Sequence, residues 1–124
     1  MSTAKVLVVD DHPLIARATK ETLEQMEGIR VVGIAGNGSK CMEMVEEHEP
    51  DLVILDYHLP DLLGDVVMKR IKQKYAHIHV IIFTGIDLKD SFNHLIELEV
   101  SGIISKEAEP EDVQALVQCV LKNQ

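Results

Sequence analysis

The stretch Val6-Leu-Val-Val-Asp-Asp-His-Pro13 places a short apolar run directly before two acids and a proline. Four apolar residues bounded by polar ones indicate a strand buried on both faces, as in a parallel sheet. Pro13 suits the first turn of a helix, because a backbone N–H at that position has no intrahelical partner. The segment therefore predicts a strand, a loop with two carboxylates and a helix.

The same pattern returns further along the chain. Three later apolar runs each lead to a polar residue: 52–55 to Asp56, 80–83 to Thr84 and 102–104 to Lys106. The carboxyl ends of parallel strands meet at one edge of a sheet, where open α/β folds place their sites. With Asp10 and Asp11, this edge would collect three carboxylates, a hydroxyl and an ammonium. Such a set of side chains can bind a divalent cation and a phosphoryl group at the same time.

Predicted strands and helices alternate along the whole chain. We expect strands at 5–9, 29–35, 52–55, 80–83 and 102–104. We expect helices at 13–27, at 39–47 with Ser39 as its cap, at 65–75, at 87–98 with Asp87 as its cap, and from Pro110 onward. Five βα units with short connections require right-handed crossovers. The predicted fold class is therefore α/β, a flavodoxin-like, doubly wound (βα)5 domain whose five-stranded parallel sheet has the order 2-1-3-4-5.

The first and last predicted helices have apolar stripes that indicate their buried faces. The first stripe comprises Ile15, Ala18, Thr22 and Met26. The last is the cleanest amphipathic pattern in the chain and comprises Val113, Leu116, Val117, Val120 and Leu121.

Composition predicts one domain over residues 1–124 with an aliphatic core, because the chain is 46% hydrophobic but has no Trp, two Phe and two Tyr. The net charge of −9 argues against direct contact with nucleic acid. No run is long enough to cross a membrane, and residues 1–20 lack a signal-peptide core, so we expect a cytoplasmic protein. Cys41 and Cys119 lie in apolar helical patterns and are predicted to be buried thiols in a reducing compartment.

The three acids at the predicted sheet edge can be interpreted in two ways. Clustered carboxylates repel one another, and burial raises their pKa unless a cation compensates. Mg²⁺ (or Mn²⁺) prefers such oxygen ligands. Alternatively, Asp10 and Asp11 could cap the first helix. Capping explains one acid well and two poorly, and it does not involve Asp56, so we favour a metal site.

In their order and spacing, the five polar positions resemble the receiver domain of two-component response regulators, and the resemblance covers essentially the whole chain. Pro60 and Gly64, four and eight residues after Asp56, also fit. The resemblance implies a non-enzymatic switch in which Asp56 accepts a phosphoryl group from a sensor histidine kinase. Stretches 6–13 and 105–112 further resemble the NarL/FixJ-like subfamily, which carries a C-terminal LuxR-type helix-turn-helix for transcriptional output. A stand-alone receiver or a phosphorelay intermediate remains an alternative.

The resemblance also assigns roles to single residues. Asp11 would bind Mg²⁺ directly, Asp10 would help through water, and Asp56 and the backbone carbonyl of His58 would be further ligands. Thr84 and Lys106 would bind the phosphoryl group, as would the backbone N–H groups of Tyr57 and Gly85.

Phosphorylation would favour a symmetric homodimer. The dimer surface would be formed by the first and last helices or by the fourth helix, the fifth strand and the last helix.

The chain departs from the family pattern at two positions. Ile103 stands where the family often has an aromatic ring that moves with the threonine, so ring rotation cannot report the switch. Glu107 stands where a proline often gives a cis peptide bond. A cis bond before a non-proline residue costs about 3 kcal/mol, so the Lys106–Glu107 bond should be trans or strained.

Other functions fit the sequence less well. A haloacid-dehalogenase-type phosphatase also uses an aspartate nucleophile and Mg²⁺, but it needs a second acid where this chain has His58. A flavin-binding protein of similar fold needs a hydroxyl-rich phosphate loop and aromatic residues, and this chain has few aromatics. His77 and His79 suggest a zinc pair without a third ligand, so we interpret them as solvated residues. His12 lies beside the acids and is interpreted as an ordinary loop residue, with a modest influence on the charge of the site as the alternative.

Overall fold

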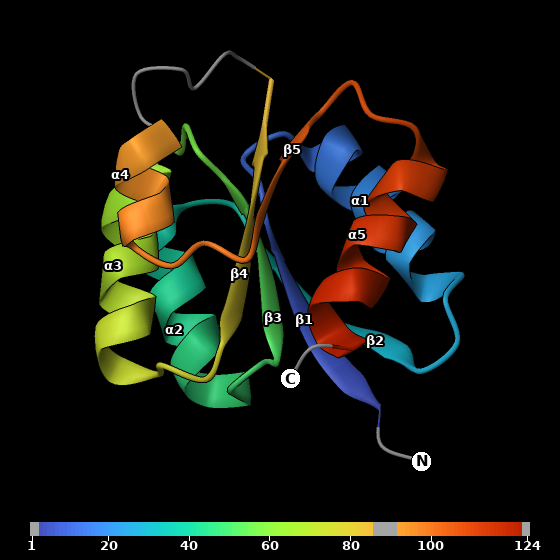
Figure 1. Cartoon of the computed structure of the whole chain (residues 1–124), viewed down its shortest axis with the longest axis horizontal. Helices are drawn as coiled ribbons and strands as arrows, with labels where there is room; N and C mark the ends of the chain where they lie inside the picture. Colours follow the sequence, from blue (N-terminus) through green and yellow to red (C-terminus); the bar gives the residue numbers. More distant parts are fainter. Residues whose placement is uncertain (1–2, 86–91, 123–124) are drawn as a thin grey trace.

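Five strands and five helices alternate in the computed structural model, which describes residues 3–85 and 92–122 (Figure 1). The strands are β1 (Ala4–Val9), β2 (Ile29–Ala35), β3 (Leu52–Asp56), β4 (His79–Thr84) and β5 (Gly102–Ser105). The helices are α1 (Pro13–Glu24), α2 (Gly38–His48), α3 (Gly64–Lys74), α4 (Phe92–Glu97) and α5 (Pro110–Lys122). The predicted start of the fourth helix, including Asp87, lies outside the described residues.

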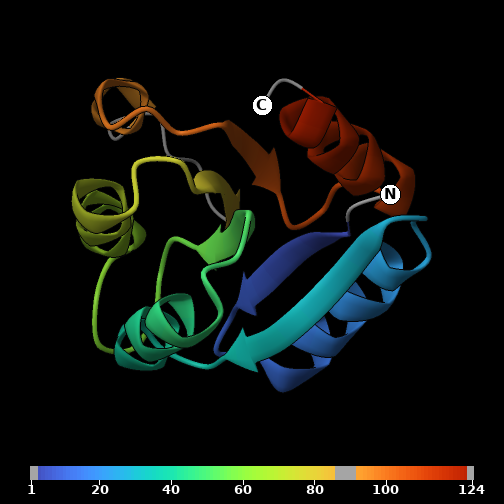
Figure 2. The same ribbon diagram turned by 90° about the horizontal axis from the view of Figure 1, so that it is seen from below.

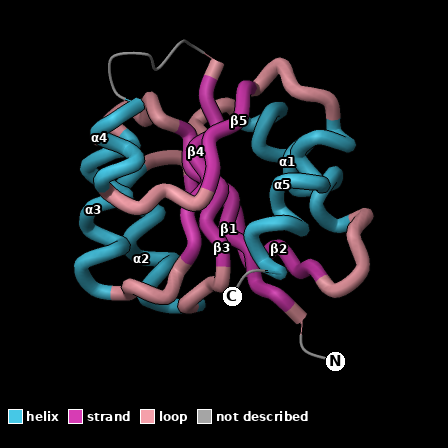
Figure 3. Tube along the Cα trace, in the orientation of Figure 1, coloured by secondary structure: helices cyan, strands magenta, loops and turns pink. Residues whose placement is uncertain are grey.

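The strands form one parallel sheet in the order β2-β1-β3-β4-β5, which confirms the predicted flavodoxin-like topology. Helices α1 and α5 cover one face, and α2, α3 and α4 cover the other (Figures 1 and 3). The view along the sheet in Figure 2 shows the same three layers. Because all strands run in one direction, their carboxyl ends share one edge.

Apolar side chains are buried on both faces of the sheet, which explains the unbroken apolar runs. In β1, Val6 and Val8 pack in the cluster beneath α1 and α5, whereas Leu7 and Val9 pack in the cluster beneath α2, α3 and α4. Successive side chains of a strand point to opposite faces. Each residue of this run therefore contributes to one of two aliphatic cores.

The predicted apolar stripe of the first helix is confirmed at Ile15 and Met26, which are half-buried against the core, but it is wrong at Ala18. The buried residues are Ala16, Thr19 and Leu23, and Ala18 is exposed. Thr19 can face inward because its hydroxyl donates a hydrogen bond to the backbone oxygen of Ile15 at 2.9 Å. The hydroxyl is thereby satisfied, which removes most of the cost of burying it. The predicted stripe of α5 is confirmed, with Val113, Val117 and Val120 buried.

Two smaller predictions are also corrected. Helix α2 is capped by Asn37 instead of Ser39, since Asn37 Oδ1 accepts the backbone N–H of Lys40 at 2.7 Å. Cys41 is buried as predicted, but Cys119 is exposed. The α5 stripe runs on either side of Cys119, through Val117 and Val120, so the thiol lies on the outer face of the helix. None of the described helices combines the length and apolar character needed to cross a bilayer.

Candidate functional site

Asp10 and Asp56 lie side by side at the carboxyl ends of neighbouring strands. Val9 of β1 pairs with Leu55 of β3, so the residues that follow them are adjacent. Both acids are buried, with only 3% of Asp10 and 4% of Asp56 exposed. Asp11 lies in the loop after β1 and is exposed. The two strands thus bring together carboxylates that are 46 positions apart in the sequence, as the predicted order of the strands requires.

Lys106 reaches both buried acids from the far side of the site. Its backbone N–H donates to the oxygen of Thr84 at 2.8 Å, which holds the end of β5 against β4. Its Nζ lies 3.0 Å from Asp10 Oδ2 and 3.1 Å from Asp56 Oδ2. The contact with Asp56 is also a hydrogen bond. The Lys106 ammonium therefore forms ion pairs with two carboxylates.

Burial and this ion pair oppose each other in setting the charge states. Burial raises the pKa of Asp56 above its usual value, although the Lys106 ammonium and the His58 N–H act in the opposite direction. For Lys106, burial tends to lower the pKa, but its close contacts with the Asp10 and Asp56 carboxylates outweigh burial, and the net pKa is raised. The lysine is therefore held in its charged form, as a group that binds anions must be.

The loop after β3 orients the Asp56 carboxylate. The backbone N–H of His58 donates to Asp56 Oδ1 at 3.1 Å. The N–H of Gly64 donates to the Tyr57 oxygen at 2.6 Å, and this approach requires glycine, because a Cβ on residue 64 would lie 2.8 Å from Tyr57 Cα. The same short loop therefore carries both the Tyr57 N–H and the His58 carbonyl.

His12 takes part in the cluster more directly than its loop position suggested. Its Nδ1 lies 3.0 Å from Asp10 Oδ1 and 3.0 Å from Asp11 Oδ1. Its backbone N–H also donates to Asp10 Oδ1, at 2.9 Å. His12 is itself the N-cap residue of α1, so neither acid occupies the capping position. Capping of α1 therefore does not explain the pair of acids.

The residues present fit a hard divalent cation. Asp10, Asp11, His12 and Asp56 each offer a ligand atom, and these atoms lie within 4.8 Å of one another. Asp10 Oδ2 is buried and accepts no well-directed hydrogen bond from the described residues, although Lys106 Nζ is close. Among the residues that the structure describes, Lys106 contributes the ammonium that faces these three carboxylates, so a further cation would balance the charge of the cluster.

Thr84 and Gly85 border the lysine from the end of β4. Thr84 is buried and pairs in register with Ser105, directly before Lys106. A Cβ on Gly85 would meet Lys106 Cδ at 3.9 Å, an ordinary contact.

Ile103 is half-buried and packs against the core beneath α2, α3 and α4. The described residues contain no cis peptide bond, so the Lys106–Glu107 bond is trans.

No second metal cluster was found within residues 3–85 and 92–122. His77 is exposed, as predicted for a solvated residue. His79 differs from that prediction, because it begins β4, is half-buried and places Nδ1 3.2 Å from Ser101 Oγ.

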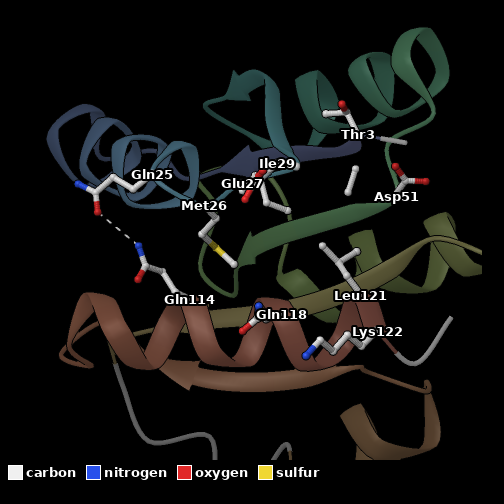
Figure 4. Close-up of a pocket in the computed structure, with 12 residues that line it drawn as sticks. Thr3, Gln25, Met26, Glu27, Ile29, Asp51, Gln114, Gln118, Leu121 and Lys122 are labelled. Carbon is white, nitrogen blue, oxygen red and sulfur yellow. Dashed lines mark hydrogen bonds between the residues drawn. The ribbon is translucent and has the colours of Figure 1, made fainter. Parts of the chain in front are cut away.

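A surface hollow lies at the opposite edge of the sheet from the acids (Figure 4). Its lining includes Ala4 and Ile29, which begin β1 and β2, and Lys122, which ends α5. These positions mark the amino ends of the strands. The hollow therefore takes no part in the acidic site.

Comparison with known proteins finds a matching family model and related sequences. Residues 6–118 match the family model described as the response regulator receiver domain. The chain is 28% identical over 110 residues to the nitrate/nitrite response regulator protein NarL of Escherichia coli (strain K12). It is 29% identical over 124 residues to a protein-glutamate methylesterase/protein-glutamine glutaminase of Trichodesmium erythraeum (strain IMS101).

A solved structure agrees with these sequence matches. A two-component response regulator of the LuxR family from Aurantimonas superposes with a TM-score of 0.92 at 26% identity, covering 99% of this chain and 88% of that one. The sequence matches cover 89% of this chain but 51% of NarL, and 98% of this chain but 35% of the methylesterase. The chain thus spans about half the length of NarL and about a third of the length of the methylesterase.

Proposed function

The chain belongs to the response regulator receiver domain family, and from this membership we propose that it is a phosphoacceptor switch whose acceptor is Asp56. One observation carries the proposal: Asp56 lies buried at the sheet edge, oriented by the His58 N–H and paired with the Lys106 ammonium. A carboxylate held in this way can attack phosphorus, provided that positive charge meets the phosphoryl oxygens.

The proposed reaction transfers a phosphoryl group from a phosphohistidine of a sensor kinase. A carboxylate oxygen of Asp56 forms a bond to phosphorus while the phosphorus–nitrogen bond breaks, and the imidazole nitrogen retains the electron pair. Lys106 and Thr84 bind phosphoryl oxygens, and the backbone N–H groups of Tyr57 and Gly85 complete the set of donors. Water later hydrolyses the acyl phosphate, which returns Asp56 to its carboxylate form.

Asp10, Asp11, Asp56 and the His58 carbonyl would hold Mg²⁺ or Mn²⁺. When bound, the cation neutralises charge on the phosphoryl oxygens. Asp10 and Asp56 are both buried, so the cation would be held at the sheet edge beside the lysine. The oxygen-rich ligand set favours these hard ions over zinc.

The proposed output is transcriptional, through a LuxR-type DNA-binding domain in the natural protein. The similarity to NarL and to the LuxR-family structure supports this choice. The similarity to a methylesterase shows that a related sequence also occurs as part of an enzyme. A stand-alone receiver or a phosphorelay intermediate is the second candidate.

A phosphatase of the haloacid-dehalogenase type is disfavoured. Such an enzyme needs a second acid two residues after its nucleophile, and the residue two positions after Asp56 is His58, whose exposed side chain has no carboxylate.

Phosphorylation by a small donor tests the proposed function. Incubation with acetyl phosphate and Mg²⁺ should add one phosphoryl group that is stable to acid and labile to base. Asp56→Asn should abolish incorporation, because an amide is a poor nucleophile. The matched control is Asp65→Asn, which removes a carboxylate on α3 that pairs with His94 and does not belong to the acidic cluster. Incorporation by Asp56→Asn at the wild-type rate would overturn the proposal.

A further inference from the structure

The loop between β3 and α3 is closed at its base. Gly64 donates its N–H to the oxygen of Tyr57, and His58 forms an antiparallel bridge with Leu63. His58 in turn donates its N–H to Asp56. Because only four residues lie between Asp56 and the loop tip at Asp61, a displacement of the tip must be accommodated by the backbone of this short closed segment.

Asp61 fastens the tip of the loop to a different helix. Its Oδ1 accepts the N–H of Gly38 at 2.7 Å, and its Oδ2 accepts the N–H of Ser39 at 3.0 Å. Both donors lie in the first turn of α2, where backbone N–H groups have no partner within the helix. The positive end of the helix dipole also favours a carboxylate there. The Gly38 bond and, to a smaller extent, the Ser39 bond lower the pKa of Asp61.

The residue next to Asp61 packs at the same point. A Cβ on Gly38 would lie 2.8 Å from Leu62 Cδ1 and 3.1 Å from Val67 Cγ2, so the loop approaches α2 as closely as glycine permits. Asn37 caps α2 independently, by accepting the N–H of Lys40. The helix thus has a cap of its own, and Asp61 adds a connection between α2 and the loop.

We propose that Asp61 is a positioning residue for the Asp56 site. By tying the loop tip to α2, its carboxylate fixes the backbone of His58, which orients Asp56 through its N–H. The same backbone supplies the His58 carbonyl to the cation, a step that rests on the proposed function above. A role confined to helix capping would stabilise α2 without affecting the site.

Two variants separate these roles. Asp61→Ala removes the connection, and Asn37→Ala removes a cap of the same helix while leaving the loop attached. Both should lower the urea midpoint. Only Asp61→Ala should speed hydrogen exchange at the His58 N–H, measured by NMR without metal. Only Asp61→Ala should weaken Mg²⁺ binding, by about tenfold in calorimetry, as is typical of groups that hold metal ligands in place. Asp61→Asn retains one acceptor oxygen and should give a smaller loss.

The outcomes distinguish this inference from the proposed function. If the wild-type protein neither binds Mg²⁺ nor accepts a phosphoryl group, the proposed function fails, while exchange at the His58 N–H still tests Asp61. If the wild-type protein does both, unchanged exchange and Mg²⁺ affinity in Asp61→Ala would overturn the positioning role. An equal loss in Asn37→Ala would also overturn it. If Asp61→Ala does not fold, the same criteria apply to Asp61→Asn.

Discussion

Lys106 and Asp56, 50 positions apart in the sequence, meet through a hydrogen bond of 3.1 Å between Nζ and Oδ2. The same Nζ lies 3.0 Å from Asp10 Oδ2. The lysine therefore lies against two of the carboxylates that would hold a cation. Its ammonium favours an anionic phosphoryl group but repels a divalent metal, and these two effects can be measured separately.

Lys106→Met should slow phosphorylation and strengthen Mg²⁺ binding. Methionine keeps much of the side-chain volume but removes the charge that would meet the phosphoryl oxygens. Removing a unit charge this close to the cation should raise Mg²⁺ affinity roughly tenfold. Calorimetry and incorporation from acetyl phosphate measure the two effects, with Lys40→Met as a surface control. Weaker Mg²⁺ binding in Lys106→Met would show that the lysine organises the carboxylates more than it repels the metal.

Asp11→Ala should weaken Mg²⁺ binding far more than His77→Ala does. Asp11 supplies a carboxylate to the cluster, whereas His77 is exposed at the opposite end of β4. Mg²⁺ prefers oxygen to imidazole nitrogen, so only the first change should matter. Titration of both variants with Mg²⁺ checks the prediction. Equal losses would place the cation elsewhere.

The apolar runs predicted the strands closely, because burial on both faces leaves little choice of residue. Their ends were harder to predict. Strand β3 extends to Asp56 and β4 to Thr84, so pairing continues into the polar residues of the site. The carboxyl-edge argument correctly placed Lys106 near Asp56, because β3 and β5 end at the same edge with only β4 between them, within reach of the long lysine side chain.

Contacts made by side chains and loops could not be predicted in the same way. The sequence pattern did not predict that Thr19 lies on the inward face of α1, because its hydroxyl is satisfied by a hydrogen bond to the backbone of its own helix. The bonds from Asp61 to α2 join residues 22 and 23 positions apart, and no sequence period marks them. A carboxylate at a loop tip has many possible partners, and only the packing of α2 against the loop selects these two.

Acid should remove the stability that Asp61 provides. Its pKa is lowered from 3.8 by the Gly38 and Ser39 N–H groups, so the folded protein binds fewer protons than the unfolded chain in this range. The contribution is therefore present above the unfolded pKa and is lost as pH falls through the lower folded value. Asp61→Asn should reduce the urea midpoint at pH 7, and its difference from wild type should shrink at low pH. Asn37→Ala, which removes no titrating group, should show the same difference at both pH values.

The two thiols should differ strongly in reactivity. Burial raises the pKa of Cys41 to about 12, and Asp61 adds to the shift. At pH 8 the thiolate fraction of such a group is on the order of 10⁻⁴, and reagents also cannot reach it. Iodoacetamide should therefore modify Cys119 first and Cys41 only after unfolding, as followed by mass spectrometry. In Cys119→Ser the native protein should show no fast modification, and rapid loss of both thiols in the native wild type would contradict the burial of Cys41.

Phosphorylation should favour a weak symmetric dimer through the α1 and α5 faces. The alternative surface, α4 with β5 and α5, has Ile103 in place of a ring that could report the switch. Both surfaces offer an exposed apolar side chain: Leu14 on α1 is 81% exposed and Ile96 on α4 is 52% exposed. Leu14→Arg should therefore weaken the dimer, and Ile96→Arg should not.

Sedimentation velocity of the beryllofluoride-activated protein measures this dimer. Each chain carries a net charge of −9, so self-repulsion opposes association and added salt should strengthen it. If Ile96→Arg disrupts the dimer and Leu14→Arg leaves it intact, the α4–β5–α5 surface is the correct one. If the activated wild-type protein stays monomeric at high concentration with and without salt, this domain does not dimerise by itself.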